Sequence, residues 1–198
     1  MSRAHERRQG GFTVVETVIS LALVGLVVTK LALVMDEARR AHQQESLAMA
    51  LEDQAMELID RISFALVGAA RQKLTPDMEA PFPAAEIHYQ VSTGVEDGQS
   101  VWSAPEVIGL ADEGSIYWAE NQGEADERLV VWANTVSQML QDELVNGVDD
   151  NGNDLADELG LAFVLDARSV TIRLSLERTA DDGKKIQVSK ETTVTCRN

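Results

Sequence analysis

An apolar run near the N-terminus constrains the fold of this chain more than any other feature. Residues 12–35 read FTVVETVISLALVGLVVTKLALVM, in which Glu16 and Lys30 are the charged side chains. A helix of this length, at about 1.5 Å per residue, can cross a hydrocarbon layer of about 30 Å. We therefore expect residues 12–35 to form a transmembrane helix.

The charges on either side of this run predict its orientation. The basic side chains of Arg3, Arg7 and Arg8 precede it, and the acidic side chains of Asp36 and Glu37 follow it. By the positive-inside rule, the N-terminus lies in the cytoplasm and the remainder lies in the periplasm or outside the cell. A secretory signal peptide is the alternative, but its apolar region would span only about 7–15 residues before a small-residue cleavage site.

The carboxylate of Glu16 does not suit a passive anchor. A carboxylate within an apolar membrane helix is costly to bury and usually has a cationic partner. The motif GFTVVE at residues 11–16, followed by the apolar run, resembles the N-terminus of type IV pilins and type II secretion pseudopilins. The resemblance implies a leader, residues 1–11, that a prepilin peptidase removes by cutting after Gly11 and then methylating the amine of Phe12. It also implies that Glu16 pairs with that amine on a neighbouring subunit; a signal anchor with an incidental Glu16 is the alternative.

The N-terminal helix is expected to continue beyond the membrane. No proline occurs before Pro76, and no glycine lies between Gly25 and Gly68. Apolar residues recur at spacings of three and four, at Leu47, Leu51, Ala55, Leu58, Ile62, Leu66 and Ala69. We expect residues 36–74 to form this extracytoplasmic continuation, solvated at first and then packed on a sheet. An isolated coiled coil is the alternative, although clean heptads do not persist.

Residues 75–198 have the pattern of a β-rich globular domain. The apolar period changes to two, and short β-prone runs occur at 87–91, 116–118 and 129–132. Alternation over residues 170–176, a turn at 179–184 and an in-phase return over 186–196 predict a β-hairpin. The expected fold class is α+β, with a long N-terminal helix, transmembrane then amphipathic, on an antiparallel β-sheet. This is also the pilin-like architecture that the resemblance implies.

Cys196 is the single cysteine, which excludes an intrachain disulfide and a cysteine-rich metal site. It falls on the apolar phase of the last expected strand, so we expect it to be buried and inert. Major pilins commonly join two cysteines in a C-terminal loop. The single cysteine therefore makes the chain more similar to a minor, J-type subunit than to a major pilin.

Residues 146–158, NGVDDNGNDLADE, form an acidic loop dense in oxygen donors. Oxygen ligands in a flexible loop suit Ca²⁺. The spacing is similar to that of EF-hand-like loops and predicts as ligands Asp149, Asn151, Asn153, the carbonyl of Leu155, Asp157 and Glu158. Two positions depart from that pattern: Asp154 replaces the turn glycine, and Gly160 replaces the bidentate glutamate. A solvated loop of turn-forming residues is the alternative.

Composition and missing motifs narrow the function. The 33 acidic and 17 basic residues give a formal net charge of −16, which would repel phosphate backbones and disfavours a nucleic-acid partner. No catalytic motif occurs, and His88 is expected on the polar face of a strand, so we expect no enzyme. The resemblance implies a structural subunit of a pilus or secretion pseudopilus, with the prepilin peptidase, other pilin or pseudopilin subunits and the inner membrane as partners. The alternative is a membrane-anchored calcium-binding or ligand-binding module that does not polymerise.

Overall fold

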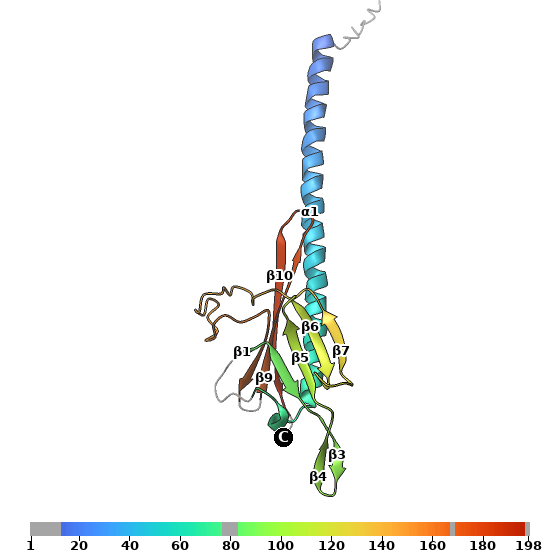
Figure 1. The fold of residues 1–198 in the computed structure, drawn as a ribbon. Coiled ribbons are helices and arrows are strands. Elements are labelled where there is room, and N and C mark those ends of the chain that lie inside the picture. The colour runs from blue at the N-terminus through green and yellow to red at the C-terminus, as the bar shows by residue number, and fades with distance from the viewer. Residues whose placement is uncertain (1–12, 77–82, 167–168, 197–198) are drawn as a thin grey trace, which may run out of the picture. The chain divides into compact units, whose positions relative to one another are not determined.

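The structure, a computed structural model, describes residues 13–76, 83–166 and 169–196 (Figure 1). The chain divides into two units, Met1–Gln43 and Gln44–Asn198. One helix of 54 residues, α1 (Val14–Val67), contributes to both units. Its length follows from the sequence, because neither proline nor a second glycine interrupts the segment after Gly25.

In the first unit, α1 is exposed along its whole described length, from Val14 to Gln43. Its apolar segment is long and apolar enough to span a membrane, and none of that segment is buried within the protein. The expected membrane-spanning candidate is therefore present as a continuous helix, which suits a single-pass membrane anchor.

The helix ends at Val67, earlier than the expected boundary at residue 74. The backbone N–H of Ala69 donates to the Leu66 carbonyl at 3.0 Å, and that of Ala70 donates to the Gln90 carbonyl at 3.2 Å. A short 3₁₀ helix, η1 (Arg71–Lys73), follows. Pairing with the strand region thus takes over the backbone hydrogen bonds that a longer helix would have used.

The second unit contains two four-stranded antiparallel sheets and a separate hairpin. The first sheet has the order β1-β8-β9-β10 and the second has the order β2-β5-β6-β7. The strands of the first sheet are β1 (Pro83–Ala84), β8 (Leu161–Asp166), β9 (Ser169–Thr179) and β10 (Lys185–Thr195). Those of the second are β2 (Glu86–Tyr89), β5 (Glu106–Ala111), β6 (Ser115–Glu120) and β7 (Arg128–Ala133), and the hairpin is β3 (Ser92–Glu96) with β4 (Gln99–Trp102).

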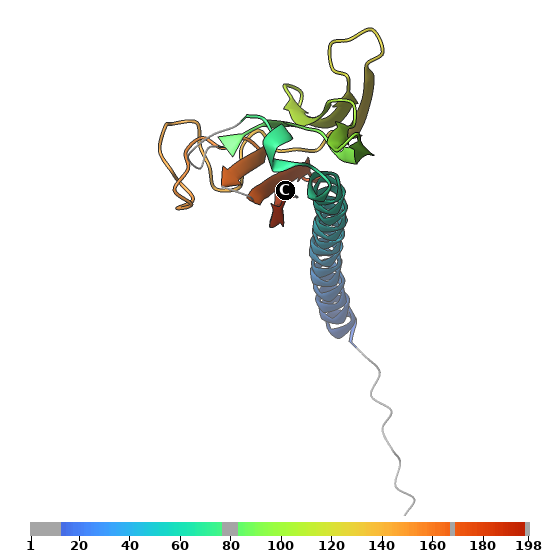
Figure 2. The same cartoon turned by 90° about the horizontal axis from the view of Figure 1, so that it is seen from below.

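The core of this unit joins α1 to both four-stranded sheets (Figures 1 and 2). The expected apolar stripe is confirmed within α1: Leu51, Ala55, Leu58, Ile62 and Leu66 are buried, Ile59 joins them, and Leu47 is half-buried. Ala69, also expected in the stripe, is buried but lies after the end of the helix. Facing residues of the core include Ile87 and Ile108 from one sheet and Phe163 and Ile172 from the other. The expected α+β class, a long helix on antiparallel sheets, is confirmed.

The predicted C-terminal hairpin is also confirmed. Strands β9 and β10 pair over their whole length, with Val170 opposite Val194 and Leu176 opposite Val188. Cys196 follows β10 and is only 5% exposed. Burial raises the pKa of its thiol, against a smaller lowering by Arg71. A buried thiol with a raised pKa is a poor nucleophile, as expected from the sequence.

Candidate functional site

The processing motif predicted from the sequence lies at the start of the chain, and Gly11 and Phe12 fall outside the described residues. The structure describes the chain from Thr13, immediately before α1. The side-chain oxygen of Thr13 accepts the backbone N–H of Glu16 at 3.3 Å, and its carbonyl accepts that of Thr17 at 3.1 Å. Thr13 therefore caps the helix and places Glu16 in its first turn, where a carboxylate interacts favourably with the helix dipole.

Glu16 is exposed on the helix surface, together with the aliphatic side chains around it. The exposed neighbours include Val15 (68%), Ile19 (55%) and Leu23 (60%). Within the described part of the chain, no side chain donates to the carboxylate of Glu16. An exposed carboxylate on a continuous apolar surface needs a cationic partner from outside the described residues once water is excluded.

The acidic loop folds around the carboxylate of Asp149. This group accepts backbone N–H bonds from Gly152 at 2.6 Å, Asn153 at 3.1 Å and Asp154 at 2.7 Å. Desolvation raises the pKa of Asp149, but these backbone donors outweigh it and bring the pKa below its usual value. Asp154 has a φ of 66° and so occupies the left-handed conformation that the expected turn glycine would adopt.

Two further carboxylates hold the ends of the loop together. Asp157 accepts the backbone N–H groups of Asn146 at 2.8 Å and Gly147 at 2.9 Å. Glu143, which is 4% exposed, accepts those of Asn151 at 3.3 Å and Asp157 at 3.2 Å. Sequence analysis did not single out Glu143, because its burial depends on how the loop folds over it.

Glu158 points away from the loop surface and into the domain. It is fully buried, and its Oε1 lies 2.6 Å from Nη1 of Arg173 on β9. Asn153 donates to its other oxygen, and Arg173 also binds Glu191 on β10 at 2.7 Å. Partial burial lowers the pKa of Arg173, but its two acidic partners outweigh this and raise it. This ion-pair network ties the acidic loop to the β9–β10 hairpin.

The donor chemistry of the predicted calcium ligands fits Ca²⁺, but their side chains are not gathered around one point. Within residues 13–76, 83–166 and 169–196, no group of three or more histidine, cysteine or acidic side chains could hold a metal ion. Asp149 and Asp157 face backbone N–H groups, and Glu158 faces Arg173. Gly160 has a structural reason: an added Cβ would lie 1.9 Å from the Ser137 carbonyl oxygen, so the glutamate of an EF-hand cannot occupy this position.

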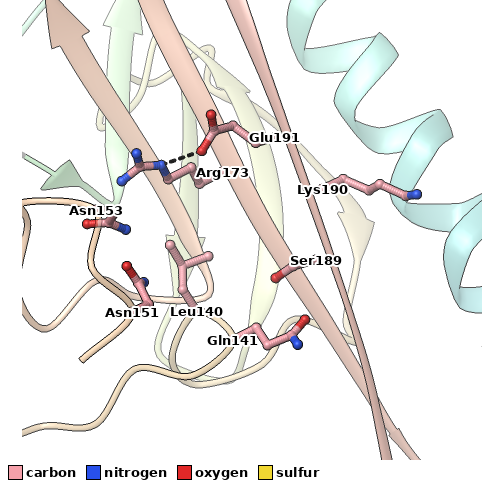
Figure 3. Close-up of a pocket in the computed structure, with 8 residues that line it drawn as sticks. All are labelled: Leu140, Gln141, Asn151, Asn153, Arg173, Ser189, Lys190 and Glu191. Carbon is pink, nitrogen blue, oxygen red and sulfur yellow. Dashed lines mark hydrogen bonds and ion pairs between the residues drawn. The ribbon is translucent and has the colours of Figure 1, made fainter. Parts of the chain in front are cut away.

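A cavity of about 330 Å³ lies between the acidic loop and the β9–β10 hairpin, and Leu140 is among the side chains that line it. Figure 3 shows Asn151 and Asn153 on the loop side, below Arg173, and Lys190 pointing away from the cavity. Lys190 instead binds Glu52 of α1 at 2.6 Å, and Arg173 is held by its two acidic partners. The basic groups beside the cavity are therefore already paired with acidic side chains.

A second polar network, not predicted from the sequence, lies on the sheet β2-β5-β6-β7. Tyr89 donates to Glu106 at 2.7 Å, and the indole N–H of Trp118 donates to the same carboxylate at 2.9 Å. Tyr117 donates to Glu86, which also lies 2.6 Å from His88. Burial, followed by the Glu86 contact, raises the pKa of Tyr117 to about 12, and burial and Glu106 raise that of Tyr89 further.

Tyr89 pairs with a carboxylate on the neighbouring strand β5, whereas Tyr117 on β6 reaches across β5 to Glu86 on β2. Only the strand order and register could have revealed the network. Comparison of the chain with models of protein families, with curated proteins and with solved structures gives no match.

Proposed function

We propose that this chain is a pilin-like structural subunit, cut after Gly11 by a prepilin peptidase and assembled through α1 into a pilus or a type II secretion pseudopilus. The observation that carries the proposal is the difference in burial between the two parts of α1. Residues 14–43 are exposed and mostly apolar, whereas the buried stripe from Leu51 to Leu66 belongs to the domain core. Such a helix can bury its N-terminal part against lipid or against identical helices while its C-terminal part carries a folded domain.

The mechanism combines helix packing with one charge pair. In the membrane, the apolar surface of α1 is covered by lipid, and in a filament it is covered by neighbouring α1 helices. Cleavage after Gly11 creates an amine at Phe12, four residues before Glu16. A buried carboxylate is tolerated when it meets a charged amine, so a neighbour in the wrong axial position would leave both charges unpaired. Glu16 thereby selects the axial position of the subunits.

Orientation follows from the arginines before the apolar run. The N-terminus is assigned to the cytoplasm and the domain Gln44–Asn198 to the periplasm or the exterior. The single cysteine and the resemblance favour a minor, J-type position in the filament. The orientation and the minor position are both inferred from the sequence, and both depend on processing after Gly11 and on assembly through α1.

Intact mass spectrometry of the protein extracted from membranes tests the processing step. The expected result is loss of residues 1–11 and a methyl group on Phe12. A chain that keeps residues 1–11 contradicts the proposal and favours the non-polymerising membrane-anchored module.

The assembly step is tested with Glu16→Ala, which should leave membrane insertion intact but reduce recovery of the subunit in sheared filaments. Glu45→Ala, on the same helix but after the apolar segment, is the matched control and should assemble normally. Equal recovery of both variants would show that Glu16 has no role in assembly.

A further inference from the structure

The proposed assembly through α1 leaves Lys30 without a role. This lysine is exposed on the apolar part of the helix, and the residues one turn away on either side are Leu26, Val27, Leu33 and Val34. Residues three and four apart are neighbours on a helix surface. No acidic group of its own chain can therefore neutralise Lys30 within one turn, and none does so elsewhere in the part of the chain that the structure describes.

Asp36 and Glu37 are the next acidic residues along the same helix, and of these two only Glu37 lacks a partner among the described side chains. Asp36 is bound by Arg40, with Nη2 and Oδ2 2.7 Å apart. Glu37 is exposed, and no described side chain binds its carboxylate. Lys30 and Glu37 are seven residues apart, so on one helix they lie about 10 Å from each other along the axis.

The axial spacing of these charges suits two parallel copies of the chain. Pairing Glu16 with the Phe12 amine of a neighbour shifts the two copies by four residues, about 6 Å. Pairing Lys30 of that neighbour with Glu37 shifts them by seven residues, about 10 Å, in the same direction. The difference, about 4.5 Å, is within the reach of a flexible four-carbon lysine stem.

The angular positions agree with a single contact face. Glu16 and Glu37 are 21 residues apart (37 − 16), which at 3.6 residues per turn leaves them about 60° apart around the helix axis. An apolar contact stripe on a helix is about 100° wide. One copy can therefore present both carboxylates to the same neighbour, and that neighbour supplies both cations.

We propose that Lys30 of one subunit binds Glu37 of its neighbour, as a second intermolecular ion pair that the lysine stem can reach at the stagger set by the pair made by Glu16. The proposal rests on the proposed function, because the stagger is defined by the Glu16 pair. The occupant of this face is a second copy of α1. In a misplaced neighbour, Lys30 would lie against aliphatic side chains without an acidic partner. Wrong axial positions are therefore disfavoured both at Glu16 and at Lys30.

Charge reversal in full-length chains, in cells that make the filament, tests this pair. Lys30→Glu and Glu37→Lys should each reduce recovery of the subunit in sheared filaments by about tenfold. The double variant Lys30→Glu/Glu37→Lys should restore recovery to within about threefold of the unaltered chain. Lys30→Glu/Asp36→Lys is the matched control: it has the same charges one residue away on another face, and it should not restore recovery.

The outcomes separate this proposal from the one on which it rests. If Lys30 only reaches the phosphate groups of lipids, Glu37→Lys alone assembles normally and the double variant is as poor as Lys30→Glu; either result overturns the ion pair. Glu37→Lys leaves the apolar segment unchanged, so it remains informative if Lys30→Glu does not insert into the membrane. If the unaltered chain is not cut after Gly11, the proposed function fails, whereas normal processing and assembly without rescue refute the Lys30–Glu37 pair alone.

Discussion

Arg173 is the residue on which the acidic loop depends for its attachment to the β9–β10 hairpin. It is 17% exposed and pairs with Glu158, which is fully buried. Removing one partner of a buried pair leaves an uncompensated charge, at a cost of about 3–5 kcal/mol. We expect Arg173→Met to lower the free energy of unfolding by about that amount, measured by urea denaturation of the full-length protein in detergent.

Glu191 provides the control for this substitution. It binds the same guanidinium, but its side chain is 56% exposed, and exposed ion pairs contribute only about 0–1 kcal/mol. Glu191→Gln should therefore change the stability little. Equal effects of the two substitutions would show that burial of Glu158 does not determine the strength of the network.

Both tyrosines of the chain have raised pKa values, which predicts a loss of stability at alkaline pH. Their unfolded pKa is about 10, and that of Tyr117 in the folded protein is about 12. A group whose pKa is raised by folding stabilises the protein fully below its unfolded pKa, and this contribution is lost as pH rises towards the folded value. The free energy of unfolding should fall between pH 10 and about 12.

The ultraviolet absorbance of tyrosinate measures this titration directly. The folded protein should show no ionisation step near pH 10, whereas the chain in concentrated urea should titrate there. Tyr117→Phe should make the pH dependence shallower, because only Tyr89 then contributes. A full step near pH 10 in the folded protein would contradict the hydrogen bonds to Glu86 and Glu106.

Calcium binding by the acidic loop stays a prediction, supported by its charge. Within the described part of the chain, Asp149, Asp150, Asp154 and Asp157 have no basic side-chain partner, so like charges repel one another unless a cation is bound. At a calcium concentration about one hundred times the Kd, the melting temperature should rise by roughly 5–10 °C relative to excess chelator.

Asp149→Ala separates calcium binding from the folding of the loop. This substitution also removes backbone hydrogen bonds, so the informative quantity is the difference between the melts with calcium and with chelator. That difference should vanish in Asp149→Ala and persist in Asp181→Ala, an exposed acid in the β9–β10 turn. Superimposable melts of the unaltered protein would mean that the loop is only a hydrogen-bonded turn.

At the residue scale, the sequence predicted which segment is rich in oxygen ligands, but it did not predict which side chains pair with one another. The oxygen-rich loop was recognisable, because its donors are adjacent in the chain. The partner of Glu158 was not, since Arg173 comes from a strand whose register only the fold defines. The requirement for glycine at position 160 could not be predicted for the same reason, because it arises from the Ser137 carbonyl, which is distant in sequence and leaves no room for a side chain.

At the scale of elements, α1 has two faces in the second unit that should respond differently to substitution. Ile62 is fully buried in the core, whereas Phe64, two residues later, is 86% exposed. Ile62→Ala should lower the free energy of unfolding by about 2–5 kcal/mol, because it leaves a cavity. Phe64→Ala, the matched control, should change it by no more than about 0.5 kcal/mol, as measured by the same denaturation experiment. Similar losses would mean that a different face of the helix packs on the sheets.

Periodicity predicted the elements that have one buried and one exposed face. It succeeded for the stripe of α1 and for β9 and β10, where alternation is regular over many residues. It did not identify β8, whose residues LAFVLD are almost all buried, because a short continuous apolar run does not distinguish a strand from a helix. It also missed the β3–β4 hairpin, where β3 is exposed throughout and has no apolar alternation to detect.

For the whole molecule, the division at Gln44 predicts that the domain folds without the apolar part of α1. Every described residue before Gln44 is exposed, so none of them contributes to the core. Contacts between the helix and the hairpin begin at Gln44, whose amide donates to Asp182 at 2.7 Å and accepts from Lys184 at 3.3 Å. A chain that begins at Gln44 should be soluble and should retain the melting temperature of the full-length protein in detergent.

A chain that begins at Met56 tests whether folding depends on the helix as a packed element. It lacks Leu51 and Ala55, which are fully buried, and Glu52, which binds Lys190. Loss of a buried leucine alone costs about 2–5 kcal/mol, comparable with the total stability of about 5–15 kcal/mol of an ordinary domain. This chain should melt at a much lower temperature or fail to fold, whereas equal stability of the two truncated chains would mean that the first half of the apolar stripe contributes nothing. The expected folding of the chain that begins at Gln44 means that residues 1–43 are not needed for the stability of the domain. A defect caused by Glu16→Ala or Lys30→Glu in the full-length chain can then be assigned to assembly and not to unfolding.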